Sequence, residues 1–384
     1  MKKLYWRPGK ISWKIHLMIM LTAITGIILV ENLKFTIEVE HYDIKIRASQ
    51  IMQDAITTIK DYRVKNNIEM PIDPEIDPME SGLIGPHLTP ITTKSVSLEA
   101  KQITVNPNWA AVIIEMFKQA KLERGDTIGA AFSGSFPAMN IAVLAAAEAM
   151  GLKIVLISSL GSSTFGANIP ELNWLVMEDI LHNKRIITSR RSVGYSLGGT
   201  KDIGVSMTKD GRDLLKRLVQ ASNTEFIYER DPQNNIDQRL KLYNKYSEEK
   251  IKLFVNVGGN TYVAGKRLTK NLYRQGLIFQ PSYQAMAVDS VMARFAKRRV
   301  PLINIRGPKS LARKYQFPIE VQRIPVVGRG RVFATQKYNK ILVGIVLFII
   351  ASFLLLFIKM DIGYRIFSTK KSESDKKTNP GQMV

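Results

Sequence analysis

The chain has 384 residues, of which 45% are hydrophobic and 23% are charged, and its formal net charge is +22. This composition is typical of a globular protein rather than a disordered one, and the length allows one large domain or two small ones. The sequence contains no cysteine, which excludes disulfides, thiolate metal sites and a cysteine nucleophile. We therefore expect packing alone to stabilise the fold.

Apolar runs near the two ends of the chain predict two membrane-spanning helices. The first 14 residues carry five lysines and arginines and no acidic residue, and an apolar run follows from Ile15 to Val30. A cleavable signal peptide begins in the same way, but no small-residue cleavage site follows, so an uncleaved anchor is favoured. The second run, Ile341 to Ile358, contains no charge and has the length of a transmembrane helix rather than of a buried core helix.

The basic residues close to both runs predict the orientation. Lysines and arginines flank the runs in both tails, which predicts a two-pass cell-membrane protein with cytoplasmic termini and an extracytoplasmic middle region. Most of the positive charge then lies outside and suggests an anionic partner, unless it only keeps the domain soluble. Nucleic acid is not expected, because it is not normally present there and no zinc-finger or RNA-motif spacing occurs.

We expect six segments along the chain. They are a cytoplasmic basic tail (1–14), a transmembrane anchor (15–32), a helix with an irregular proline- and glycine-rich segment (33–100), an extracytoplasmic α/β domain (101–336), a second transmembrane helix (341–360) and a cytoplasmic basic tail (361–384).

The first part of the middle region combines a helix with an irregular stretch. Apolar residues between Ile44 and Tyr62 recur at helical spacing and predict an amphipathic helix. The stretch Met70 to Pro90 holds four acidic residues without the glycine and final glutamate of a calcium loop, so we expect a solvated loop, no metal site and no cofactor. Asn106 and Pro107 are expected to cap and open the next helix, which ends before Gly125.

The central region predicts a layered α/β fold. A strand at Thr127–Phe132, a tight turn at Ser133–Ser135, an apolar helix at Pro137–Met150 and a strand at Lys153–Ile157 predict a right-handed parallel crossover. Further strands (253–257, 301–305) alternate with helices (210–221, 236–246, 290–297). The expected fold class is α/β, a mostly parallel three-layer sheet domain between an N-terminal and a C-terminal transmembrane helix.

Small, hydroxyl-rich loops follow the predicted strands, at the edge where open parallel sheets bind ligands. Backbone N–H groups near Ser133 and Ser135 could hold a carboxylate or phosphate. A helix terminus contributes only about 0.3 to 1 kcal/mol, whereas micromolar affinity requires roughly 8 kcal/mol. Cationic side chains must therefore converge as well, and the candidates are Arg190, Arg191, Lys201, Lys266 and Arg306. The candidate ligand-binding residues are Ser133, Gly134, Ser135, Ser162, Ser163, Lys201, Asp202, Gly258, Gly259 and Asn260.

A catalytic interpretation makes Ser133 or Ser135 a nucleophile. The turn is similar to a nucleophile elbow but lacks its two glycines, and the sequence does not tie a base to it. Bases to consider are His41, His87, His182 and Lys201 beside Asp202. Structural caps and tight turns explain these residues equally well, so whether the protein is an enzyme stays open.

Several segments together are similar to a known family. They are DPEIDPMESGLIG, RGDTIGAAFSGSFPAMNIAVLAA, SSLGSSTFGAN followed by Trp174, SLGGTKDIG and VNVGGN. In these segments the chain resembles the poly-gamma-glutamate system protein family. The resemblance implies a membrane component of the bacterial apparatus that makes or exports poly-gamma-glutamate, with the polymer and the synthase or export subunits as partners. It supplies no catalytic residues.

Two functions follow from the resemblance and the loops. The domain either binds the anionic polymer or partner subunits, or hydrolyses or transfers a gamma-glutamyl amide with a serine. The sequence has no GxxxxGK[ST] phosphate-binding loop, so the ATP-dependent ligation is expected to belong to other subunits.

Overall fold

The chain forms two units in the computed structural model, which describes residues 13–320 and 322–360. One unit comprises residues 1–37 and 335–384, and the other comprises residues 38–334. Apart from residues 13 and 14, the basic tails predicted from the sequence lie outside the described residues.

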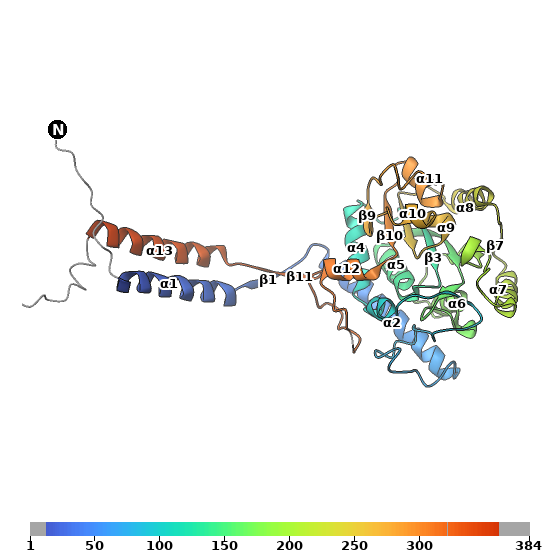
Figure 1. The fold of residues 1–384 in the computed structure, drawn as a ribbon, viewed down its shortest axis with the longest axis horizontal. Coiled ribbons are helices and arrows are strands. Elements are labelled where there is room, and N and C mark those ends of the chain that lie inside the picture. Colours follow the sequence, from blue (N-terminus) through green and yellow to red (C-terminus); the bar gives the residue numbers. More distant parts are fainter. Residues whose placement is uncertain (1–12, 321, 361–384) are drawn as a thin grey trace, which may run out of the picture. The chain divides into compact units, whose positions relative to one another are not determined.

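The smaller unit contains two helices and most of a two-stranded sheet. Helices α1 (Trp13–Asn32) and α13 (Lys340–Met360) lie side by side in Figure 1. Gly26 permits their close approach, because a Cβ atom at this position would overlap the side chain of Val346. The sheet pairs β1 (Phe35–Glu38) with β11 (Ala334–Lys337). None of the helices among the described residues is long and apolar enough to cross a membrane.

The larger unit is an α/β fold on a seven-stranded sheet, which confirms the α/β class. The strand order is β7-β6-β4-β3-β8-β10-β9. All neighbouring strands run parallel except β9, which pairs antiparallel with β10. The strands are β3 (Thr127–Ser133), β4 (Lys153–Ser159), β6 (Gly194–Ser196), β7 (Glu225–Ile227), β8 (Leu253–Val257), β9 (Gly276–Ile278) and β10 (Leu302–Ile305). A separate parallel pair joins β2 (Thr92–Lys94) to β5 (Ser162–Ser163).

Helices cover both faces of this sheet (Figure 1), because its strands are apolar on both sides. In β3, Ile128, Ala130 and Phe132 pack into one core and Ala131 packs into the other. The first core includes residues of α2 (Tyr42–Lys65), α4 (Trp109–Gln119), α5 (Pro137–Met150), α6 (Trp174–Asn183) and α12 (Pro308–Tyr315). The second includes residues of α8 (Pro232–Tyr246), α9 (Thr261–Ala264) and α11 (Val291–Lys297). A smaller core lies under α7 (Lys209–Ala221), and α3 (Leu98–Gln102) and α10 (Arg267–Lys270) are short.

Most predicted elements are present, but the predicted starts of two helices are wrong. Helix α8 begins at Pro232 rather than at Ile236, where the prediction placed it. Helix α5 and strand β8 have the predicted bounds, and Gly151 ends α5 with φ +64°. Helix α4 begins at Trp109, not at Asn106 and Pro107. A 3-10 turn over Ile103–Val105 comes first, and the side chain of Asn106 accepts from the Asn108 N–H at 3.0 Å. This intervening turn delays the helix.

Glu178 of α6 is a buried carboxyl group without a cationic partner among the described residues. It accepts hydrogen bonds from the N–H and hydroxyl groups of Ser192 and from the Tyr195 hydroxyl, at 2.7 to 2.8 Å for the closest contacts. Burial raises the pKa of Glu178 from 4.5 to about 7, against the opposing effect of these hydrogen bonds. The folded protein therefore binds this proton more tightly than the unfolded chain does.

This difference predicts a pH-dependent stability. The contribution of Glu178 is most favourable below about pH 4.5 and is lost as the pH rises through about 7, a difference of roughly 3 kcal/mol. We expect Glu178→Gln to gain stability relative to the wild type between pH 5 and 8 (~3 kcal/mol), measured by urea unfolding. Glu171→Gln, at an exposed position, is the control. Parallel pH curves for the wild type and Glu178→Gln would contradict the assignment.

Candidate functional site

The carboxyl ends of the central strands border one polar pocket. Strand β4 lies on one side of β3 and β8 on the other, so the chain reverses its direction across the sheet at this point, where open α/β sheets bind ligands. The pocket has a volume of about 200 Å³. It is lined by Thr93, Lys94, Ser133, Ser135, Ser159, Gly161, Gly199, Thr200, Gly259, Asn260, Thr261 and Lys270.

The loop between β3 and α5 presents two hydroxyl groups to this pocket. The Ser133 hydroxyl accepts from the Ser135 N–H at 3.2 Å, and the Ser135 hydroxyl accepts from the Ser163 N–H at 3.1 Å. Each oxygen thus already accepts one bond, and its hydrogen stays available for donation. Gly134 is required between them, because a Cβ atom there would lie 2.6 Å from the Leu160 carbonyl oxygen.

Cationic side chains gather beside the same pocket. A Cβ atom at Gly259 would lie 3.6 Å from Lys94 Nζ and 3.9 Å from Arg306 Nε. Arg306 donates to the carbonyl of Lys270 and to Asn271 Oδ1 at 2.7 Å, both uncharged acceptors. The side chain of Lys94 forms no hydrogen bond or ion pair with the residues that the structure describes, although its backbone carbonyl accepts from the Thr164 N–H at 2.9 Å. Desolvation lowers the pKa of Lys94, and the charge of Arg306 lowers it further.

Lys101 lies behind the loop Ser133–Ser135, which is called the serine loop from here on. It is 2% exposed, and its ammonium group donates to the Ser135 carbonyl and to the Ser163 hydroxyl, the latter at 2.8 Å. It also lies 4.0 Å above the ring of Phe136. No carboxylate in the described residues pairs with it. Burial lowers the pKa of Lys101 well below its usual range, and the charge of Lys94 adds to this effect.

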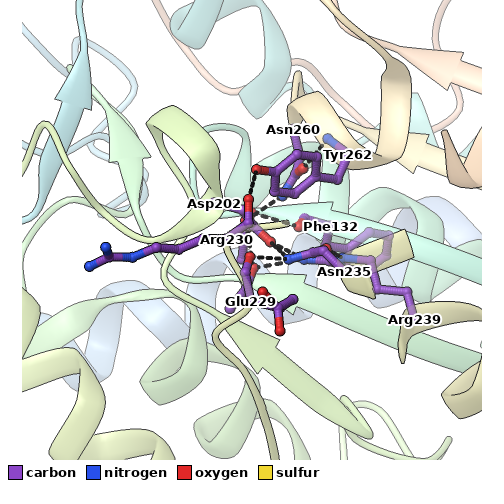
Figure 2. Close-up of polar contacts among 10 residues, drawn as sticks. Phe132, Asp202, Glu229, Arg230, Asn235, Arg239, Asn260 and Tyr262 are labelled. Carbon is purple, nitrogen blue, oxygen red and sulfur yellow. Dashed lines mark hydrogen bonds and ion pairs between the residues drawn. The ribbon is translucent and has the colours of Figure 1, made fainter. Parts of the chain in front are cut away.

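A buried ion pair joins the loop after β6 to helix α8, and its carboxylate also contacts the loop after β8 (Figure 2). Arg239 of α8 donates to Asp202 Oδ2 at 2.5 Å, and both side chains are at most 1% exposed. Asp202 Oδ1 accepts from Ser196 at 2.8 Å and from Asn260 at 2.6 Å. Asn235 bonds both partners. The pair fixes the two loops that carry Thr200 and Asn260 to the pocket wall.

The structure brings most of the predicted ligand-binding residues together, with different roles in the geometry. Ser133, Ser135, Gly259 and Asn260 line the pocket. Asn260 donates to Asp202 and accepts from the Tyr262 N–H, so its amide is already engaged. The remaining predicted residues lie elsewhere. Gly134 lies within the loop between Ser133 and Ser135, and Ser162 and Ser163 pack behind this loop. Gly258 approaches Ser133 with φ +104°, Asp202 is buried in its ion pair, and Lys201 is exposed and does not line the pocket.

Among the cations predicted from the sequence, only Arg306 adjoins this pocket in the described part of the chain. Arg190 and Arg191 line other pockets, which also contain residues such as Lys153 and Glu225 at the starts of strands. Lys266 is exposed next to α10. The sequence interpretation missed Lys94 and Lys101, which precede β3, the first strand of the seven-stranded sheet in chain order. No local motif marks them. Lys101 contacts residues 34 and 62 positions away, and Lys94 lines the pocket at the end of β2.

The histidines considered as bases do not approach the serine hydroxyls. His87 packs on the ring of Phe165 with centroids 5.3 Å apart, and His41 lies at the start of α2. Burial lowers the pKa of His182 to about 4. No hydrogen bond joins any of them to Ser133 or Ser135 within residues 13–320.

Comparison with known proteins adds no assignment. No family model, no curated protein and no solved structure matches the chain.

The ion pair generates a stability prediction. Removing one partner of a buried pair typically costs about 3 to 5 kcal/mol, because the other charge stays buried without compensation. We expect Asp202→Asn and Arg239→Met each to lower the unfolding free energy by about this amount, measured by urea denaturation. The double variant should lose clearly less than the sum of the single losses. Additive losses would show that the two side chains do not act as a pair.

Proposed function

We propose that the larger unit binds the carboxylate groups of poly-gamma-glutamate, as a membrane-anchored component of the apparatus that makes or exports this polymer. One observation carries the proposal. Lys94 and Lys270 line the pocket and Arg306 adjoins it, whereas the lining contains no acidic side chain. Three other surface pockets of the described chain each include a glutamate. Those three pockets contain lysines or arginines as well, so the absence of an acidic side chain is what distinguishes this pocket from them.

The donors around the pocket suit a carboxylate. A carboxylate only accepts hydrogen bonds, and the ammonium group of Lys94 and the hydroxyl hydrogens of Ser133 and Ser135 only need to donate. A hydrogen bond to a charged group contributes about 1.5 to 3 kcal/mol. Three such bonds would supply roughly 5 to 9 kcal/mol, a range that includes the roughly 8 kcal/mol of micromolar binding.

Membrane attachment is the second part of the proposal, and it rests on the sequence and on the exposed side chains of the smaller unit. The run Ile341–Ile358 contains no charged residue. Large apolar side chains of both helices face outward, including Ile27 (63% exposed), Phe348 (72%) and Ile341 (77%). Contiguous exposed apolar surface of this kind is typical of contact with lipid or another protein. We propose a two-pass arrangement with both termini in the cytoplasm.

The alternative function is serine-dependent hydrolysis or transfer of a gamma-glutamyl amide. It requires a base within hydrogen-bond reach of the nucleophile. In the described residues the hydroxyls of Ser133 and Ser135 contact backbone N–H groups, and the hydroxyl that contacts Lys101 is that of Ser163. Ser163 is fully buried. The geometry therefore favours binding over catalysis.

Replacing Ser133 and Ser135 together by alanine tests the site. If they bind carboxylate, each lost bond should cost about 1.5 to 3 kcal/mol of binding free energy, with stability nearly unchanged. If either is a nucleophile, polymer cleavage should instead fall by a factor of about 10⁶. The measurements are salt-dependent binding of the polymer and polymer length after incubation. Ser247→Ala is the control. If the folded double variant binds the polymer and shortens it to the same extent as the wild type, this loop is not part of the site.

Single cysteines introduced into this cysteine-free chain test the topology. We expect a cysteine at position 247 to react with an impermeant thiol reagent in intact, wall-permeable cells, and one at position 372 to stay protected. The reversed labelling pattern would invert the orientation.

A further inference from the structure

The positive charge at the pocket exceeds what one internal residue of the proposed polymer can balance. Every internal residue of a gamma-linked glutamate chain carries a single carboxylate. Lys94 and Lys270 line the pocket, Arg306 adjoins it and Lys101 lies behind its serine loop. Lys94 and Lys101 have no carboxylate partner among the described residues. Cationic side chains near one another repel, and one carboxylate compensates only part of this repulsion. A second negative charge on the ligand would compensate more of it.

The size of the pocket restricts the ligand to one small group. Its volume is about 200 Å³, whereas pockets for drug-sized ligands usually span roughly 300 to 1,000 Å³. Backbone packing closes its inner side, because Gly258 lies against Ser133 and Gly134 against Leu160. A long polymer segment would therefore leave most of its residues outside, whereas the end of a chain can enter.

We propose that this pocket is an end-group site that selects a compact dianion, namely the terminal glutamyl residue with both its α- and γ-carboxylates free. The inference rests on the proposed function, and it adds which part of the polymer is bound. At the carboxyl end of a gamma-linked chain the last γ-carboxylate forms no amide, so this residue alone carries two negative charges. Lys94 and Arg306 lie close to Gly259, and Ser133, at the end of β3, and Ser135 line the same pocket.

A dianionic ligand would also provide the negative charge that the surroundings of Lys94 and Lys101 lack. Burial is the main reason why the pKa values of Lys94 and Lys101 are lowered. The charge of Arg306 adds to this effect at Lys94, and the charge of Lys94 adds to it at Lys101. A ligand with two carboxylates would oppose the repulsion between these cations. A phosphate group has similar charge and size and is the other source of this chemistry, so the experiment includes it.

The test uses the full-length protein in detergent micelles and isothermal titration calorimetry. One ligand is a short gamma-linked glutamate oligomer with a free terminal residue, and the second is the same oligomer with its terminal γ-carboxylate amidated. We expect amidation to weaken binding by about 10- to 100-fold, the effect of one lost charged hydrogen bond. Lys94→Met should remove most of this discrimination. Lys184→Met, which removes an equal charge from an exposed position, should leave it unchanged.

Two further binding measurements compare polymers of different length and inorganic phosphate. At equal total glutamate, long and short polymers should saturate the protein in proportion to their number of chain ends. Equal binding of both oligomers, with saturation that follows total glutamate, would overturn the end-group inference and leave polymer binding intact. Absence of binding by either oligomer would overturn the proposed function as well. Inorganic phosphate that binds more tightly than the free-ended oligomer would overturn the assignment of the dianion as a chain end.

Discussion

The pocket depends on the buried ion pair between Asp202 and Arg239. The loop that carries Asp202 is unusual, because Gly198, Gly199, Lys201 and Asp202 all have positive φ angles between 54° and 75°. For the two non-glycine residues this conformation is unfavourable. A buried ion pair contributes little net stability, because desolvation offsets the attraction. Its consequence is geometric instead: Asp202 binds Ser196, Asn260 and Arg239 at once, and so holds three segments of the chain in one arrangement around the site.

The buried positive charge at the site lowers the stability of the fold. Lys101 is buried with only neutral acceptors, and a buried ammonium group without a counter-ion is costly. Sites at which a fold retains such a cost are typically functional, because a ligand can relieve it. Glu178 shows the contrast within the same unit. It is also buried without a cation among the described residues, but Ser192 and Tyr195 satisfy its oxygens. Glu178 does not line the pocket at the carboxyl edge of the sheet.

The sequence predicted the fold where a segment carries a strong local signal. Helix α5 and strand β8 are uniformly apolar, and turns or glycines mark their ends. The three-residue strands β6, β7 and β9 were missed, because a run that short has no periodicity to detect. The serine loop was found because it follows a strong strand. Lys94 and Lys101 were not, because only the pairing of β2 with β5 and the packing of α3 bring them to the site. Lys201, beside Asp202, was given a role that its exposed position does not support geometrically.

Binding rather than chemistry is the function most compatible with how the polar groups are connected. A nucleophilic serine needs an acceptor for its proton, and the nearest groups to the Ser133 and Ser135 hydroxyls are the donors Ser135 N–H and Ser163 N–H. The same connections leave both hydroxyl hydrogens directed to a partner that only accepts. Lys94, without a partner among the described residues, adds a third donor. An arrangement of donors with no acidic residue in the lining suits the carboxylates that we propose as its ligand. It disfavours ligands that bring their own donors, because buried donors facing each other would stay unpaired.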